Sequence, residues 1–243
     1  MNALLSIQNL QKSYVSPEGE RTMIIDVPHF EMNAGDHIAL QGRSGSGKTT
    51  LLNLIAGILQ ADFGSIKLAG QDLCTLSESE RDRVRGQNIG YIFQTFNLLQ
   101  GYSALENVEL AMRFGNGLQR SFARKLLEHT GLRDRMHYRP AQLSVGQQQR
   151  VAVARALANK PKIVLADEPT GNLDAHHAKQ ALQLIKEICR ENNAALLLVS
   201  HDPAIYEYFD RVEELASLNR VACHSEGNLV RGPRTPLTKF PSE

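Results

Sequence analysis

A glycine-rich loop constrains this chain more than any other feature. It reads Gly42, Arg43, Ser44, Gly45, Ser46, Gly47, Lys48 and Thr49, and it fills every fixed position of the pattern G-x-x-x-x-G-K-[ST]. The apolar run His37–Leu40 precedes the loop, and Thr50–Ala56 after it has helical character. Strand, loop and helix in this order are the context in which such a loop binds the phosphates of a nucleoside triphosphate. A flexible Gly/Ser turn would require neither the Lys-Thr pair nor the flanking elements.

The residue types in this loop suit a triphosphate with bound magnesium. Glycines let backbone N–H groups turn toward phosphate oxygens, and the following helix presents its positive end. Lys48 can reach the outer phosphates as a point charge, and the Thr49 hydroxyl can bind Mg²⁺. We therefore predict that the segment from Gly42 to Thr50 binds nucleotide.

Composition and charge restrict the class of protein. The 243 residues are 42% hydrophobic and 22% charged, an ordinary globular composition with enough apolar residues for a sizeable core. The net charge of +1 gives no overall field toward nucleic acid, and no nucleic-acid partner is expected. The longest apolar stretches, Leu51–Leu59 and Ala194–Val199, are shorter than a membrane span, and no signal-peptide pattern is present. We expect a cytosolic chain whose 3 cysteines are reduced.

The hydrophobic pattern predicts an α/β domain. Short alternating runs between Leu4 and Leu40 predict an antiparallel β layer that leads into the phosphate-loop strand. A helical subdomain, at about residues 95–155, is inserted before the later strands. We expect a small terminal hairpin at Glu213–Val221. One domain would cover residues 1–222, and residues 223–243 would form an extended or disordered extension.

Two residues near expected strand ends have more than one interpretation. Tyr14 can stack on a nucleotide base, but an aromatic residue on a strand more often packs in the core or across strands. Gln94 closes the apolar run Ile89–Phe93, where its neutral oxygen can bind a metal or water, or where it is simply a polar strand end. The residues alone decide neither case.

Chemically active residues also end two later apolar runs. Asp167 and Glu168 follow Ile163–Ala166, and a strand end facing a phosphate loop gives buried carboxylates a partner in Mg²⁺. Asp167 is therefore a candidate metal ligand, directly or through water, and Glu168 a candidate general base for the attacking water. His201 follows the run Ala194–Val199, where it can donate to a γ-phosphate or be an ordinary packing or surface residue.

A second candidate anion site lies in the stretch Leu143–Arg150. Ser144 and Gly146 stand at a helix start, where hydroxyl and backbone donors face one way with the positive helix end behind them. A capped helix with a polar first turn explains these residues equally well, and the helix body is expected at Val151–Ala158. Asp174 fits the N-cap of the next amphipathic helix.

Taken in order, these motifs resemble the nucleotide-binding subunit of ATP-binding-cassette (ABC) transporters. The resemblance covers about Leu4–Val212, nearly all of the expected folded part. It implies an α/β fold with a RecA-like P-loop NTPase core, an N-terminal antiparallel β layer and an inserted helical subdomain. It also implies an ATPase that uses ATP and Mg²⁺.

The resemblance assigns roles in nucleotide and metal binding. Tyr14 matches the aromatic residue that stacks on adenine, and Lys48 matches the residue that binds the phosphates and takes part in catalysis. Thr49 and Gln94 match the Mg²⁺ ligands, and Asp167 matches the acidic residue that supports the metal.

The resemblance also assigns roles in hydrolysis and assembly. Glu168 matches the catalytic base, and His201 matches the switch that contacts the γ-phosphate. Subunits of this family close head to tail on two ATP, so Ser144 and Gly146 would complete the nucleotide site of the opposite subunit. Asp174 matches a residue of the loop between the two sites. The implied partner is a second copy of the chain or a homologous subunit.

Within the family, three stretches look most like the branch of lipoprotein-release and macrolide-exporter ATPases: Phe93–Leu99, Ala104–Val108 and Pro169–Asp174. That likeness implies a separate transmembrane permease, a peripheral position on the cytoplasmic face of the inner (plasma) membrane, and efflux or extraction as the task.

One departure keeps a different function in view. Val145 replaces the glycine usual at the third position of the Leu143–Gln147 motif, and a β-branched residue can restrict the approach of the backbone to a partner's phosphates. A module that senses ATP without turnover is therefore one alternative. A soluble ATPase of the same superfamily acting on DNA or ribosomes is another, although neither the long coiled coil nor the second cassette typical of such proteins is present.

Overall fold

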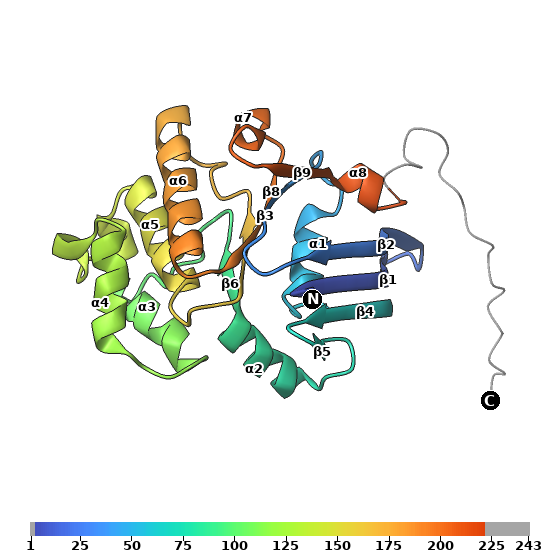
Figure 1. Cartoon of the computed structure of the whole chain (residues 1–243), viewed down its shortest axis with the longest axis horizontal. Helices are drawn as coiled ribbons and strands as arrows, with labels where there is room; N and C mark the ends of the chain where they lie inside the picture. The colour runs from blue at the N-terminus through green and yellow to red at the C-terminus, as the bar shows by residue number, and fades with distance from the viewer. Residues whose placement is uncertain (1–2, 222–243) are drawn as a thin grey trace.

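The computed structural model describes residues 3–221, and two β-sheets organise them. Figure 1 shows the antiparallel strands on one side of the molecule, the helices α3, α4 and α5 on the other, and the second sheet between them. The expected C-terminal extension, 223–243, lies outside the described residues.

The antiparallel sheet has the strand order β2-β1-β4-β5. Its strands are β1 Leu5–Val15, β2 Arg21–Met32, β4 Phe63–Leu68 and β5 Gln71–Asp72. The central strand β1 pairs with β2 on one side and β4 on the other. Polar and apolar residues alternate along these strands because one face of the sheet is packed and the other faces solvent. The predicted antiparallel layer is confirmed, and it includes strands that follow the phosphate loop.

The second sheet is parallel and has the order β6-β7-β8-β3-β9. Its strands are β3 His37–Gln41, β6 Ile89–Ile92, β7 Ile163–Asp167, β8 Ala195–Ser200 and β9 Arg211–Glu214. Since all strands run the same way, their carboxyl ends meet at one edge. In open parallel sheets this edge is where ligands bind.

Both faces of the parallel sheet are buried, which explains why its strands are continuous apolar runs. Ile38 and Leu40 of β3 pack into the core shared with the antiparallel sheet, whereas Ala39 packs on the opposite side with the helices. Helix α1, Lys48–Ile55, contacts both β2 and β7 and so lies between the two sheets. The phosphate loop, which joins β3 to α1, is therefore held by packing on either side.

The remaining helices cover the other face or the edges. They are α2 Glu78–Asn88, α3 Ala104–Arg113, α4 Arg120–His129, α5 Val145–Ala156, α6 Ala175–Glu191, α7 Pro203–Tyr206 and α8 Leu215–Leu218. Two short 3₁₀ turns, Arg133–Arg135 and Pro140–Gln142, join α4 to α5. Helices α3, α4 and α5 lie between β6 and β7 in the chain, so the predicted α/β fold with an inserted helical region is confirmed. The helix expected at Val151–Ala158 begins earlier, at Val145.

The expected hairpin at Glu213–Val221 is wrong. The strand β9 is parallel to β3 and extends the second sheet, and α8 follows it directly. The segment then returns to β2, where the Asn219 amide accepts a hydrogen bond from the Asp26 N–H at 2.8 Å and donates to the Ile24 carbonyl at 2.8 Å. Pairing with the edge of β3 and these partly buried hydrogen bonds stabilise the observed arrangement.

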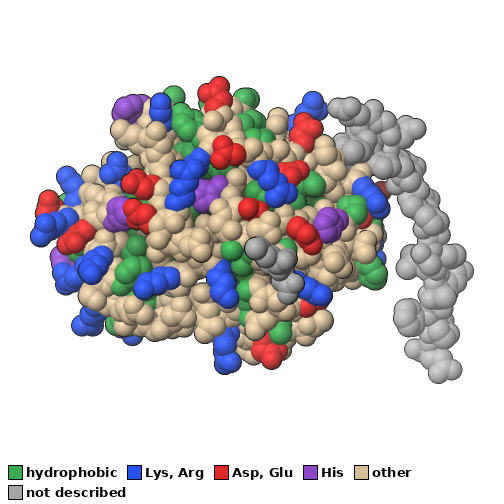
Figure 2. All heavy atoms as spheres, in the orientation of Figure 1, with side chains coloured by type: hydrophobic (Ala, Val, Ile, Leu, Met, Phe, Trp, Pro, Cys, Tyr) green, Lys and Arg blue, Asp and Glu red, His purple; other side chains and the backbone are tan. Residues whose placement is uncertain are grey.

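Surface charge is mixed. Figure 2 shows basic and acidic side chains interspersed over the visible face, in line with the net charge of +1. Among the described residues, no helix combines the length and the apolar character that a membrane span needs.

A close backbone contact in the parallel sheet gives a stability prediction. A Cβ added at Gly90 of β6 would lie 2.3 Å from the Ala156 carbonyl oxygen at the end of α5. We expect Gly90→Ala to lower the free energy of unfolding in urea by about 1–3 kcal/mol, because the backbone must shift. Gly101→Ala is the control, since nothing lies within 4 Å of its added Cβ. Equal stability of the two variants would contradict the packing described.

Candidate active site

The phosphate loop has the conformation that its glycines allow. Gly47 directly precedes α1 and has a φ of 93°, a left-handed backbone conformation that residues other than glycine adopt only at an energetic cost. A Cβ on Gly47 would lie 3.1 Å from Ile25 and 3.2 Å from Ile24, so β2 packs directly against the loop. Residues 48–50 form the first turn of α1, and no side chain caps this helix start. Its first N–H groups can therefore bind an anion.

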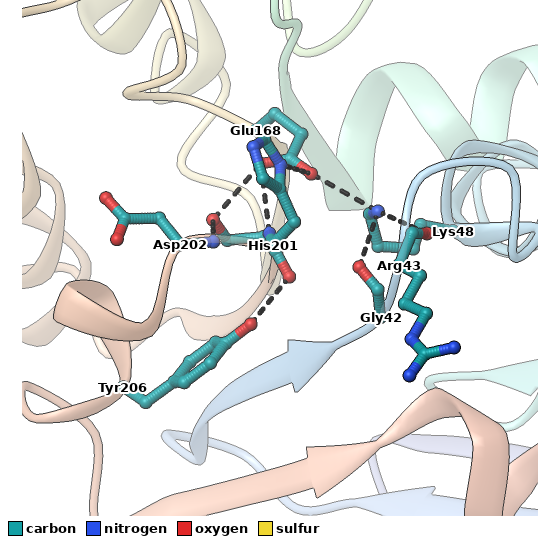
Figure 3. A network of polar contacts seen from close by, with 8 residues as sticks. Gly42, Arg43, Lys48, Glu168, His201, Asp202 and Tyr206 are labelled. Carbon is teal, nitrogen blue, oxygen red and sulfur yellow. Dashed lines mark hydrogen bonds and ion pairs between the residues drawn. The ribbon is translucent and has the colours of Figure 1, made fainter.

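Lys48 lies at the centre of a buried polar network (Figure 3). Its ammonium donates to the carbonyls of Gly42 at 2.8 Å and Arg43 at 2.9 Å, and its nitrogen lies 3.3 Å from Glu168 Oε1. Because both charged groups are largely removed from water, each stabilises the other, and losing one would leave an uncompensated buried charge.

Glu168 follows β7 in an unusual backbone conformation. Its φ is 45°, in a region that costs a non-glycine residue on the order of 1 kcal/mol and persists only where surrounding contacts enforce it. Its carboxylate accepts from the Ser200 hydroxyl at 3.1 Å and from the His201 N–H at 3.3 Å, both through Oε2. The His201 ring Nδ1 lies 2.8 Å from Oε1. The structure thus brings Lys48, Glu168 and His201 into direct contact (Figure 3).

Asp167, the last residue of β7, offers oxygen ligands at the same sheet edge. Burial raises the pKa of its carboxyl above the ordinary value, and the charge of Glu168 adds to this, while a hydrogen bond from Thr49 and the charge of Lys48 oppose it. Its Oδ1 is buried and has no hydrogen-bond partner in the described part of the chain, and the same holds for Ser46 Oγ in the phosphate loop. Unpartnered buried oxygens are costly, so this donor set fits a bound cation and phosphate.

Gln94 borders the network, whereas Tyr14 lies on β1 and is linked to the phosphate loop through the neighbouring strand β2. Gln94 is exposed and comes after the end of β6; its carbonyl accepts from the Asn172 amide at 2.8 Å, which places it beside the loop after Glu168. Tyr14 pairs with Thr22 on β2, the strand that packs against Gly47, and its side chain is 43% exposed.

Ser144, Gly146 and Asp174 form a second group, in which Ser144 and Asp174 are exposed and Gly146 is partly buried. Ser144 caps α5: its Oγ accepts from the Gln147 N–H at 3.3 Å, and its own N–H donates to Gln147 at 3.1 Å. Asp174 caps α6 and hydrogen-bonds His177, whose N–H lowers the pKa of the Asp174 carboxyl. A Cβ on Gly146 would lie 3.9 Å from the His177 ring, so the two helix starts are neighbours.

Two residues take part that the motifs did not single out. Ser200 bonds Glu168 from the end of β8, and Gln149 donates from α5 to the Pro169 carbonyl, which links that helix to the loop after Glu168. The signal for Ser200 is present in the sequence, since it is a polar residue that closes an apolar strand, as Asp167 does.

A phosphate loop at a parallel sheet edge, with a paired carboxylate, lysine and histidine, defines the class: a P-loop nucleotide-binding protein. The family model described as "ABC transporter" matches residues 25–171, and the chain belongs to this family.

Similar proteins are known in sequence and in structure. The chain is 42% identical to the lipoprotein-releasing system ATP-binding protein LolD of Pseudomonas fluorescens, over 90% of this chain and 98% of that protein. It is 38% identical to the macrolide export ATP-binding/permease protein MacB of Photorhabdus laumondii, over 88% of this chain and 33% of that protein. A dimeric ATP-binding cassette, MJ0796, in a post-hydrolysis state bound to ADP and Pi superposes with a TM-score of 0.80 at 33% identity, covering 90% and 95% of the chains.

The contacts of Lys48 give a binding prediction. We expect Lys48→Ala to weaken ATP binding about 10- to 100-fold, because charge-assisted bonds to phosphate are lost. Titration with a fluorescent ATP analogue measures this, and Lys125→Ala, which removes an exposed lysine of α4, is the matched control. An unchanged affinity for ATP in Lys48→Ala would contradict the role of Lys48 in phosphate binding.

Proposed function

We propose that this chain is the ATP-binding and ATP-hydrolysing subunit of an ABC transporter. The observation that carries the proposal is the Glu168 carboxylate, which lies 3.3 Å from the phosphate-loop ammonium of Lys48 and contacts His201. A candidate base (Glu168), a phosphate-binding cation (Lys48) and a hydrogen-bond donor (His201) therefore lie together beside the phosphate loop. Phosphoryl transfer depends on such positioning and charge neutralisation.

In the proposed reaction the phosphate loop holds the triphosphate, with its backbone N–H groups and the Lys48 ammonium on the phosphate oxygens. Glu168 accepts a proton from water, the water oxygen bonds the γ-phosphorus, and the bond between that phosphorus and the bridging oxygen of ADP breaks. His201 steadies the γ-phosphate, and Tyr14 stacks on the adenine.

Magnesium is the cation that we propose for this site. The Thr49 hydroxyl, the Asp167 carboxylate and the Gln94 amide oxygen would hold it, and the buried, unpartnered Oδ1 of Asp167 supports that choice. When bound, the ion neutralises charge on the phosphate oxygens.

A second copy of the chain, or a homologous subunit, would complete the site. Ser144 and Gly146 stand at the exposed start of α5 rather than in the Lys48–Glu168 network, and the similar cassette MJ0796 is dimeric. Asp174, beside them, would lie between the two sites. Since nucleotide contacts differ between open and closed arrangements, ATP can drive closure.

The task would be lipoprotein release or efflux, with a separate transmembrane permease as partner and the cytoplasmic face of the membrane as location. This rests on the likeness to a lipoprotein-releasing ATP-binding protein and a macrolide export protein. The alternative of ATP sensing without turnover has one observation in its favour. Val145, at the first position of α5, is 48% exposed and would face the partner's nucleotide.

The role of Glu168 gives a prediction that separates these functions. We expect Glu168→Gln to retain ATP binding, to lose at least about 100-fold in hydrolysis as only the base is removed, and to accumulate dimers with ATP. Phosphate release and size-exclusion chromatography with light scattering measure these properties. Wild-type turnover in the variant would refute the role of Glu168 as the general base. A wild-type chain that hydrolyses no ATP, with or without its membrane partner, would favour the ATP-sensing module.

A further inference from the structure

Ser200 occupies the strand between the two halves of the network. In the parallel sheet β8 lies between β7, which leads to Glu168, and β3, which leads to the phosphate loop. Ser200 is the last residue of β8 and is only 1% exposed. A polar side chain so deeply buried needs hydrogen-bond partners, and its partners show what it holds.

The backbone of Ser200 is tied to the phosphate loop. Its carbonyl accepts from the Gly42 N–H at 3.3 Å and from the Tyr206 hydroxyl at 2.9 Å. Gly42 is the residue whose own carbonyl accepts from Lys48. The position of Ser200 is therefore fixed relative to the loop, and α7 supports it from the outside through Tyr206.

The hydroxyl of Ser200 is tied to Glu168. It donates to Oε2 at 3.1 Å while accepting from the Asp202 N–H at 3.1 Å. The second donor on Oε2 is the backbone N–H of His201. Both donors belong to the end of β8, which is hydrogen-bonded on either side in the sheet and is not free to move independently.

The other oxygen, Oε1, has different neighbours. It contacts the Lys48 ammonium and the His201 ring, both on flexible side chains that phosphate oxygens would also attract. When these groups turn to phosphate, Oε1 loses its donors, whereas Oε2 keeps the two from β8.

We propose that Ser200 is a positioning residue that anchors Oε2 of Glu168, so that Oε1 is the oxygen that takes the proton from the attacking water. The inference rests on the proposed function and names which carboxylate oxygen acts and what holds it. Ser200 touches neither nucleotide nor water in this account and acts through Glu168.

The test compares Ser200→Ala, which removes only the hydroxyl, with Ser200→Thr, which keeps it. We expect Ser200→Ala to lower kcat for ATP hydrolysis about five- to tenfold, as for one lost hydrogen bond, with the KM for ATP within about twofold of wild type. Ser200→Thr should recover most of kcat. Ser121→Ala, at an exposed serine of α4, should leave both constants unchanged.

Other outcomes would overturn the inference. An unchanged kcat in Ser200→Ala, or a loss of kcat that Ser200→Thr shares although its thermal melting matches wild type, would show that the hydroxyl does not position Glu168. If Ser200→Ala instead raises KM and lowers the melting temperature together, the hydroxyl has only a structural role, as the acceptor for the Asp202 N–H. Glu168→Gln, assayed in the same experiment, distinguishes a failure of the proposed base from a failure of the role of Ser200. If it keeps wild-type turnover, the proposed base itself fails, whereas if it is inactive and Ser200→Ala is not impaired, only the role of Ser200 fails.

Discussion

The contact between Lys48 and Glu168 is the interaction on which the site depends. A positive and a negative group, both buried, lie 3.3 Å apart although they follow two strands that are not neighbours in the sheet. Such a pair is tolerable only if further hydrogen bonds satisfy both charges. The loop carbonyls do this for Lys48, and the end of β8 does it for Glu168. Three strand ends are thus joined by one network.

This network also explains how nucleotide can control the site. Triphosphate oxygens compete with Glu168 for the Lys48 ammonium, and the His201 ring is 61% exposed and can turn toward them. Binding would therefore exchange partners within the site, and Glu168, the proposed base, would be released as the phosphates arrive. The Ser200 hydroxyl and the His201 backbone N–H bond Oε2 rather than Oε1, so they can hold the carboxylate in place during that exchange.

Linear motifs predicted the parts of this arrangement that are local in sequence. The phosphate loop, the acidic pair after β7 and the histidine after β8 could each be read from an apolar run and the residues that end it. The α/β fold, the antiparallel layer and the helical region followed in the same way.

The features that the sequence did not predict depend on contacts between residues far apart in the chain. A hairpin was expected at the end of the chain, but β9 pairs in parallel with β3 instead. The edge of β3 is far away in sequence, so the local pattern could not predict this pairing. The donors on Glu168 come from residues more than thirty positions away, so the sequence marked Ser200 as a polar strand end but not as a hydrogen-bond partner of Glu168. The sequence placed a helix start at Ser144 and Gly146, and α5 does begin at Val145, but the helix body was expected only from Val151 because the first turn lacks apolar periodicity. The roles of Tyr14, Gln94 and Asp174 remain proposals that rest on the family.

The central claim is that each site needs residues from two chains, and complementation tests it most directly. Ser144→Arg would spoil the site of the opposite subunit, and Lys48→Ala would spoil its own, so each variant alone should be inactive. A dimer of the two variants has one site with both Lys48 and Ser144 intact. Phosphate release is measured for each variant and for the mixture. The account predicts that mixing restores hydrolysis, and a mixture as inactive as its components would contradict it.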